Sequence, residues 1–358
     1  MLATGSCHDR GAEARIGYPL AWLGPDVGRV AQAAIADAGS GPVVEIPLAL
    51  MDQRRAAAKR PGYGAEVAYA EAMLTIPRLA VMVGHLSSRG SLLAAPIYGE
   101  NRIPFIVPTA TSRRIRAVGP WTFQLAPDDS EEGAFIAQFV LDRLAAHRVT
   151  IFYLLADEYG IGLRDGVVAA LHARGVAPVD QIGILEDSDF PKRLEASLRR
   201  GMPEVVVIAA RTREAAAIAR AVHARLPGAR IVAADGVSLD ALARQAGPAA
   251  ASVMAAAWWN AASPDSISRA FVAGFRHLTG HAPTPVDAMF FDGLMVAAQA
   301  VREAGVRPAA IRSYLQGLGT VHAPYHGVTG PISFAPGRSI NLVMTRLEAG
   351  VAVLAGPR

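Results

Sequence analysis

The sequence predicts an α/β protein with two Rossmann-like lobes, each with a parallel-sheet core and helices on both faces. Short runs of Val, Ile, Leu and Ala alternate with segments of helical periodicity along most of the 358 residues. A chain of this length is typical of two domains. Hydrophobic residues make up 52% but aromatic residues only 6%, a composition that suits close-packed α/β layers better than a β-sandwich.

The first lobe opens with repeated strand–helix–strand units. Apolar runs predict strands at Ile16–Leu20, Val43–Leu48, Leu79–Val83 and Pro104–Val107. Helical spacing of apolar residues predicts helices at Val27–Ala38, Ala65–Leu74 and Gly90–Tyr98. This alternation indicates parallel strands joined by crossover helices.

The second lobe begins near Pro127–Glu132, where a run of acidic residues suits a helix N-terminus. The helix then carries an apolar face from Phe135 to Leu144. Later runs predict strands at Val149–Ala156, Glu204–Ala209, Arg230–Ala234 and Ser252–Ala257, with a helix at Ile161–Arg174. Helices follow at Ser266–Thr279, Val286–Ala304 and Pro308–Gly317, and β-structure at Gly330–Phe334 and Asn341–Leu347.

No long linker separates the two lobes, so we expect the chain to cross between them several times. We assign residues 1–13 to a flexible tail, residues 14–129 and 259–337 to lobe 1, and residues 130–258 and 338–358 to lobe 2. Ligand-binding proteins that close about a hinge are often built in this way.

The composition excludes several classes of protein. The high apolar content excludes disorder as the main state. We find no run of 18 apolar residues free of charges or helix breakers, which argues against a membrane-spanning helix. The net charge is +4, and the densest cluster of basic residues is Arg113, Arg114 and Arg116. A nucleic-acid-binding groove would show a stripe of basic residues with aromatic residues between them, which this sequence lacks. We therefore expect no nucleic-acid partner.

The single cysteine, Cys7, excludes an intramolecular disulfide. The small residues before it resemble the end of a bacterial lipoprotein signal, in which that cysteine carries the lipid. The charged and apolar regions of such a signal do not precede it in this sequence. A lipid anchor through Cys7 and an inert tail cysteine both stay open.

In open α/β sheets, ligands gather beyond the carboxyl ends of the strands, next to helix N-termini. In the first lobe this position holds Ser87 and Ser88 after one strand, and Thr109, Ala110 and Thr111 after the next. These hydroxyls and backbone amides suit a carboxylate. The structural alternatives are that Ser88 only caps its helix and that the threonines only form a turn.

The corresponding turns of the second lobe hold Tyr159, Arg211 and Asp235. Arginine can hold an anion and aspartate an amine, although both residues could instead cap their helices or pair with each other. The glycines from Gly160 to Gly166 come near the dinucleotide-binding pattern, but the last glycine stands one position late. We therefore expect no nucleotide cofactor.

Catalytic and metal-binding patterns are poor. The sequence contains no Gly-x-Ser-x-Gly, His-Glu-x-x-His or phosphate-binding Gly-x-x-x-x-Gly-Lys pattern. His277 and His281 are four residues apart, but Thr279 and Gly280 end the helix between them. We therefore expect no enzyme, no cofactor and no metal site.

Several segments together resemble the leucine/isoleucine/valine-binding proteins, the substrate-binding components of ABC importers. The resemblance is carried by Val83–Ser88, Ile103–Ser112, Asp157–Leu163 and Gly327–Phe334, in the family's order. It covers roughly residues 15 to 347. It implies the type I periplasmic binding fold, with two lobes joined by a three-crossing hinge and a ligand enclosed between them by hinge closure.

The resemblance also implies a role for each site residue. Ser88 and Thr111 would supply hydroxyls to the ligand carboxylate, and Thr109 and Ala110 would lie on the loop whose backbone meets the ligand. Tyr159 would close over the ligand, and Asp235 would pair with its ammonium group. Arg211 stands where the branched-chain binders have a tyrosine. It favours a second anionic group on the ligand or competes for Asp235.

The resemblance implies a small-molecule ligand with a carboxylate, an amino acid or related compound, and a membrane-bound ABC permease as partner. We expect a monomer that is periplasmic or lipid-anchored at the cell surface. The alternative is a cytoplasmic ligand sensor of the same fold that acts on a regulator. A dehydrogenase-like enzyme is a weaker alternative, because Gly17–Leu20 lacks the glycine fingerprint.

Overall fold

The computed structural model describes residues 13–38, 42–48, 64–185, 189–338 and 341–355. The chain divides into two compact units, called unit 1 and unit 2 below. Unit 1 takes Met1–Ala110, Ile115–Leu125 and Ala270–Ser339, and unit 2 takes Thr111–Arg114, Ala126–Arg269 and Ile340–Arg358. The lobe boundaries and the hinge expected from the sequence stay predictions.

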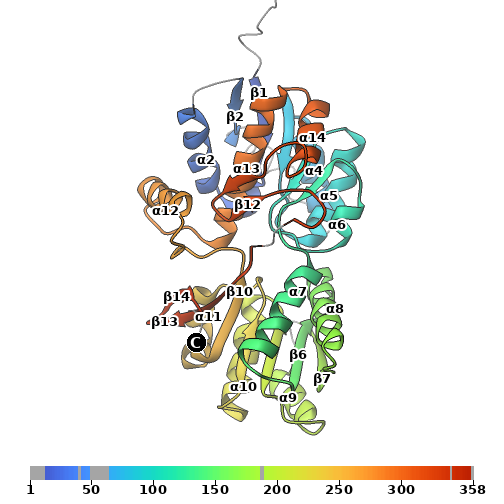
Figure 1. Cartoon of the computed structure of the whole chain (residues 1–358), viewed down its shortest axis with the longest axis vertical. Helices are drawn as coiled ribbons and strands as arrows, with labels where there is room; N and C mark the ends of the chain where they lie inside the picture. The colour runs from blue at the N-terminus through green and yellow to red at the C-terminus, as the bar shows by residue number, and fades with distance from the viewer. Residues whose placement is uncertain (1–12, 39–41, 49–63, 186–188, 339–340, 356–358) are drawn as a thin grey trace, which may run out of the picture. The chain divides into compact units, whose positions relative to one another are not determined.

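Unit 1 is built on a sheet of five parallel strands in the order β2-β1-β3-β4-β5 (Figure 1). The strands are β1 (Glu13–Gly17), β2 (Val43–Glu45), β3 (Leu79–Val83), β4 (Phe105–Val107) and β5 (Thr122–Gln124). All residues of β3 and β4 are buried, as expected of central strands covered by crossover helices.

Helices flank this sheet. Near the start of the chain lie α1 (Leu20–Leu23), α2 (Asp26–Asp37), α4 (Gly64–Leu74), α5 (Ser88–Glu100) and α6 (Arg114–Ala117). Near its end lie α12 (Ser266–Thr279), α13 (Pro285–Ala304) and α14 (Pro308–Gly317), with the two-stranded ribbon β11 (Tyr325–Gly327) and β12 (Gly330–Ile332). Helix α2 packs against α13, and α4 packs against α5. Segments from both ends of the chain therefore share one core.

Unit 2 contains a seven-stranded sheet in the order β14-β13-β10-β9-β8-β6-β7. Five strands are parallel: β6 (Val149–Leu154), β7 (Asp180–Ile184), β8 (Val205–Ala209), β9 (Arg230–Ala233) and β10 (Val253–Ala257). The last two, β13 (Val343–Glu348) and β14 (Val351–Leu354), extend the sheet in antiparallel fashion beyond β10.

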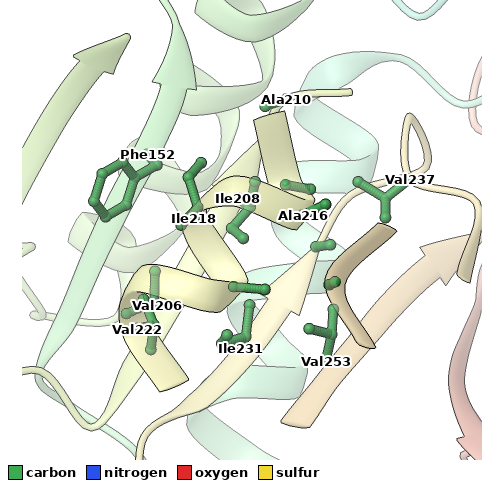
Figure 2. Close-up of a cluster of buried hydrophobic side chains, with 14 of the residues drawn as sticks. Phe152, Val206, Ile208, Ala210, Ala216, Ile218, Val222, Ile231, Val237 and Val253 are labelled. Atoms are coloured by element: carbon green, nitrogen blue, oxygen red, sulfur yellow. The ribbon is translucent and has the colours of Figure 1, made fainter. Parts of the chain in front are cut away.

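The helices of unit 2 follow the crossover pattern. They are α7 (Asp129–Gln138), which continues as a π-helical turn over Phe139–Arg143, α8 (Glu158–Ala173), α9 (Phe190–Leu198), α10 (Thr212–Arg225), α11 (Leu239–Ala246) and a 3-10 segment over Gly247–Ser252. Figure 2 shows Ile218 and Val222 of α10 beside Val206 and Ile208 of β8. This apolar contact fixes α10, and with it the strand-to-helix turn at Arg211.

Helices α7 and α8 approach each other through glycines. A methyl group on Gly133 of α7 would overlap the backbone of Gly166 on α8, and one on Gly166 would overlap the backbone of Asp129. A methyl group on Gly162 would overlap the Asp129 carboxylate. The glycines that came near a dinucleotide fingerprint therefore serve helix packing, and they bring the first turn of α7 against α8.

The observed elements confirm the α/β prediction and correct it in places. The predicted strand at Ile16–Leu20 lies too late, because β1 spans Glu13–Gly17 and Pro19 begins α1. The charged residue Arg15 interrupts the apolar run that would have predicted this strand. In the structure its guanidinium pairs with Glu45 of β2 at 2.8 Å. Strands β5, β7, β11 and β14 were not predicted. Strands β5, β7 and β14 are sheet edges, where one side faces water and a continuous apolar run is not needed.

Candidate functional site

In unit 1 the candidate site lies at the carboxyl end of β3. Ser87 is the N-cap of α5, and its hydroxyl accepts a hydrogen bond from the Gly90 amide at 3.1 Å. Ser88 is thus the first residue of the helix rather than its cap, and it is buried. The alternative in which Ser88 serves only as the N-cap is wrong. Its position beside the helix N-terminus suits contact with an anion.

The loop after β4 lies against the loop after β3. The Thr109 hydroxyl donates to the Leu86 carbonyl at 2.8 Å, and Gln124 of β5 donates to the Ala110 carbonyl at 2.7 Å. Three predicted residues of unit 1, namely Ser88, Thr109 and Ala110, therefore belong to two loops that are joined directly. Thr111 begins the part assigned to unit 2, where its carbonyl accepts from the Asp129 amide at 2.8 Å.

A buried cluster that the sequence did not single out supports the β3 loop. The imidazole of His85 is fully buried, with Nδ1 2.5 Å from a Glu66 carboxylate oxygen and Nε2 3.2 Å from the Tyr98 hydroxyl. Ser91 donates to the His85 carbonyl at 3.4 Å. Glu66 and Tyr98 lie on α4 and α5, so these contacts anchor the loop before Ser88 to two helices.

In unit 2 the turns after β6 and β9 meet at Tyr159. The Tyr159 hydroxyl donates to an Asp235 carboxylate oxygen at 2.7 Å and accepts from the Gly236 amide at 2.9 Å. Asp157 caps α8 by accepting from the Tyr159 amide at 3.1 Å. A methyl group on Gly236 would stand only 2.7 Å from the Tyr159 hydroxyl. Glycine there leaves room for the contact between tyrosine and aspartate.

Arg211 is held by Asp157 rather than by Asp235. Its guanidinium lies 2.7 Å from the Asp157 carboxylate and 5.4 Å from the centre of the Tyr159 ring. Ser238, not Asp235, caps α11, and the Arg211 side chain makes no capping bond. The structural alternatives of helix capping and of an Arg211–Asp235 pair are therefore wrong. Among the residues that the structure describes, no cationic side chain forms an ion pair with the Asp235 carboxylate.

Two further carboxyl groups lie against Asp235, and both come from the first turn of α7. Glu132 is fully buried, and its Oε1 accepts from the Asp235 amide at 2.8 Å. Asp129 is 1% exposed. Burial, together with the nearby charge of Asp235, raises the pKa of Asp129 to about 7. Burial likewise raises the pKa of Glu132 well above its usual range.

Thr111 faces this acidic group. Neither the Thr111 hydroxyl nor Oδ1 of Asp129 has a partner at full hydrogen-bond geometry, although Thr111 is the main influence that lowers the pKa of Asp129. Within unit 2 the structure thus brings together four predicted residues, Thr111, Tyr159, Arg211 and Asp235, and adds Asp129 and Glu132.

The sequence did contain a signal for these acids. Asp128 and Glu131 form the predicted cap, since Asp128 accepts from the Glu131 amide and Glu131 accepts from the Asp128 amide. Asp129 and Glu132 are three residues apart, which places them on one helix face. Gly133 and Ile136 continue that buried face. The apolar face predicted for this helix therefore begins with two acids.

The surface hollow found in unit 2 lies at the other ends of the strands. It has a volume of about 600 Å³ and is lined around Glu204 and Arg230, the residues next to or at the starts of β8 and β9. Among the described residues, no three His, Cys, Asp or Glu side chains are arranged to hold a metal ion. None of the described helices combines the length and apolar character needed to span a bilayer. Cys7 lies outside the described residues.

Each of the two α/β units carries polar residues at the carboxyl ends of its parallel strands, which is where ligands bind in open α/β sheets. The sequence matches the family model described as periplasmic binding protein over residues 65–343. The chain belongs to this periplasmic binding protein family, whose members are solute-binding proteins and not enzymes. The family resemblance and the type I fold predicted from the sequence are confirmed.

Relatives and solved structures agree with this assignment. A "Leu/Ile/Val-binding protein homolog 1" of Brucella abortus is 26% identical over 260 residues, covering 71% of this chain and 67% of the relative. An "Amino acid binding protein" of Pseudomonas aeruginosa is 28% identical over 182 residues, covering 51% of this chain and 48% of the relative. The match thus spans about half the length of that relative.

Two solved structures share the fold across nearly the whole chain. The leucine-binding protein LivK of Thermotoga maritima has a TM-score of 0.78 at 21% identity, covering 96% of this chain and 97% of its own. A solute-binding protein of R. palustris, solved in complex with 4-hydroxybenzoate, has a TM-score of 0.78 at 14% identity, covering 97% and 96%.

Proposed function

We propose that this chain is the solute-binding component of an ABC importer and captures a small carboxylate ligand, an amino acid or related compound. Hinge closure of two lobes over the ligand, which the family resemblance implies, is part of this proposal. The observation that carries it is the Tyr159–Asp235 contact at 2.7 Å, with Arg211 held apart by Asp157. It leaves an anionic group at the carboxyl ends of the unit 2 strands, suited to an ammonium group.

The hydroxyls of Ser88 and Thr109 in unit 1, together with that of Thr111, supply the complementary half of the proposal. Ser88 stands at the N-terminus of α5, where backbone amides and the helix dipole favour an anion. Thr109 and Ala110 follow the neighbouring strand β4. We assign the ligand carboxylate to Ser88, Thr109, Ala110 and Thr111. The finer assignments, namely a membrane permease partner, a monomer, and a periplasmic or Cys7-anchored location, belong to the same proposal.

The experiment is a thermal-shift screen of the purified chain against amino acids, dicarboxylates, aromatic acids and amides, followed by calorimetry on each compound that stabilises it. A ligand at 100 times its dissociation constant adds about 2.7 kcal/mol of stability, which such a screen detects. Compounds with both a carboxylate and an ammonium group are expected to stabilise most. Stabilisation only by acids without an amine would remove the role of Asp235.

The site assignment is tested by the double variant Ser88→Ala, Thr111→Ala. Each hydrogen bond to a charged group contributes about 1.5–3 kcal/mol, so affinity is expected to fall about 100-fold or more. The matched control is Ser313→Ala, Thr320→Ala, which removes two exposed hydroxyls of unit 1. Equal affinity of the double variant and this control would refute the assignment.

A further inference from the structure

The Asp235 carboxylate has a second carboxyl group directly beneath it. Glu132 projects from α7 and accepts from the Asp235 amide, 103 positions along the chain, at 2.8 Å. Glu132 is fully buried, whereas Asp235 is partly exposed at the end of β9. Among the described residues, neither side chain forms an ion pair with an arginine, lysine or histidine. A fully buried acid beside a second carboxyl group, with no cation paired to either, is costly to ionise.

The Asp235 amide occupies Oε1 of Glu132, whereas Oε2 of Glu132 is buried and has no hydrogen-bond partner among the described residues. A buried carboxylate oxygen without a donor or a cation beside it is costly, and protonation removes this cost. The geometry therefore favours a proton on Glu132. The Asp235 carboxylate is partly exposed and accepts a hydrogen bond from the Tyr159 hydroxyl, which stabilises its charged form against the effect of burial, which raises its pKa. The proton therefore resides on Glu132 and the charge on Asp235.

The charged and titratable groups around the pair come from three elements. They are Asp128 and Asp129 of the α7 N-terminus, Asp157, Glu158 and Tyr159 of the α8 N-terminus, and Arg211 at the start of α10. Arg211 is paired with Asp157, and Arg114 is paired with Glu158, so neither guanidinium is paired with Asp235 or Glu132. A cation that reaches Asp235 would meet a strongly acidic environment.

We propose that Glu132 and Asp235 form a proton-sharing carboxyl pair and that binding of a ligand ammonium group at Asp235 displaces the shared proton. This deepens the proposed function, on which it rests for the site of the ammonium group. The reaction balances in charge and atoms: the protonated Glu132 and ionised Asp235 take up R–NH₃⁺, and one H⁺ leaves to solvent. Glu132 is thus a positioning residue that selects ligands with an amine.

The direction of proton movement distinguishes ligand classes. An amino acid releases up to one proton, so its affinity rises with pH by up to about tenfold per pH unit while Glu132 remains protonated in the free protein. A carboxylic acid without an amine gains nothing from loss of this proton. Its affinity is expected to be flat or to fall with rising pH.

The first experiment needs no ligand. Carboxyl ¹³C resonances of the full chain are followed from pH 4 to 9 in the wild type, in Glu132→Gln and in the surface control Glu195→Gln. We expect a glutamate carboxyl signal that titrates well above the usual range of glutamate in the wild type and in the control but is missing from Glu132→Gln. Titration of every glutamate below pH 5 would overturn the shared proton.

The second experiment uses L-leucine and L-glutamate as probes in calorimetry. Heats are measured in buffers of different ionisation enthalpy at pH 5.5 to 7.5, on the wild type and Glu132→Gln. Release of a proton by the wild type, with release lost but binding kept in Glu132→Gln, supports the pair. Binding by the wild type without proton release overturns it and leaves the proposed function standing. If neither amino acid binds, the proposed displacement of the proton by a ligand ammonium group is overturned. The carboxyl ¹³C titration then tests separately whether Glu132 and Asp235 share a proton.

Discussion

Replacement of Asp129 by asparagine should change how the stability of this protein depends on pH. Asp129 is buried in the first turn of α7, and burial raises its pKa from 3.8 to about 7. The folded protein therefore binds this proton more tightly than the unfolded chain does. The stabilisation from proton binding is fully present below about pH 4 and is lost as the pH rises through about 7.

The magnitude follows from the difference between these two pKa values. At 1.36 kcal/mol per pH unit, a rise from 3.8 to about 7 corresponds to about 4 kcal/mol. Asparagine has nearly the same shape and no charge, so Asp129→Asn lacks this dependence. Relative to the wild type, the variant should gain up to about 4 kcal/mol between pH 4 and pH 8.

The assay is chemical denaturation of wild type and variant at several pH values from 4 to 8. The control is Asp142→Asn, an exposed acid whose pKa is lowered by its hydrogen bond to Arg174. A lowered pKa gives a contribution that is present above about pH 4 and is lost only at lower pH, so the control should run nearly parallel to the wild type from pH 4 to 8. Parallel curves for the wild type and Asp129→Asn would refute the burial argument.

Three other substitutions test the packing that holds the site. Gly133→Ala should destabilise the protein by about 1–3 kcal/mol, because the added methyl group meets the α8 backbone. The control Gly274→Ala in helix α12 adds a methyl group with nothing within 4 Å and should stabilise the protein by about 0.5–1 kcal/mol. Thermal denaturation compares the two variants with the wild type. Asp292→Ala removes the acceptor of the Val328 and Thr329 amides and should lower the free energy of unfolding by about 2–5 kcal/mol. A loss below about 1 kcal/mol would contradict a stabilising role for these two hydrogen bonds. Ser87→Ala removes the α5 cap and should lower stability by about 1 kcal/mol in urea unfolding, whereas no loss would argue against the cap.

The parallel core could be predicted because each of its central strands is a continuous run of apolar residues in the sequence. Leu79–Val83 is an uninterrupted apolar run, and the structure confirms it residue for residue as β3. The strand-to-helix turns follow from the same reading, since Ser88, Thr109 and Asp235 each come directly after such a run. Edge strands such as β7 carry polar residues, including Asp180 and Gln181, and local hydrophobicity does not reveal them.

The ion-pair and hydrogen-bond partners of the site residues could not be predicted from local sequence patterns. Arg211 had several acids within plausible reach, and only the fold selects Asp157. Likewise, four consecutive or near-consecutive acids at the start of α7 look alike in sequence. Helix geometry turns Asp128 and Glu131 toward capping and turns Asp129 and Glu132 into the interior.

The sequence by itself therefore determined the fold class, the family resemblance and the positions of the turns that can hold a ligand, because these depend on residues near one another in the chain. The tertiary structure alone decided which acids lose contact with water and which pairs form. Glu132 of α7 approaches Asp235, which lies 103 positions further along the chain, after β9. Burial and charge pairing depend on that approach, which no local pattern encodes.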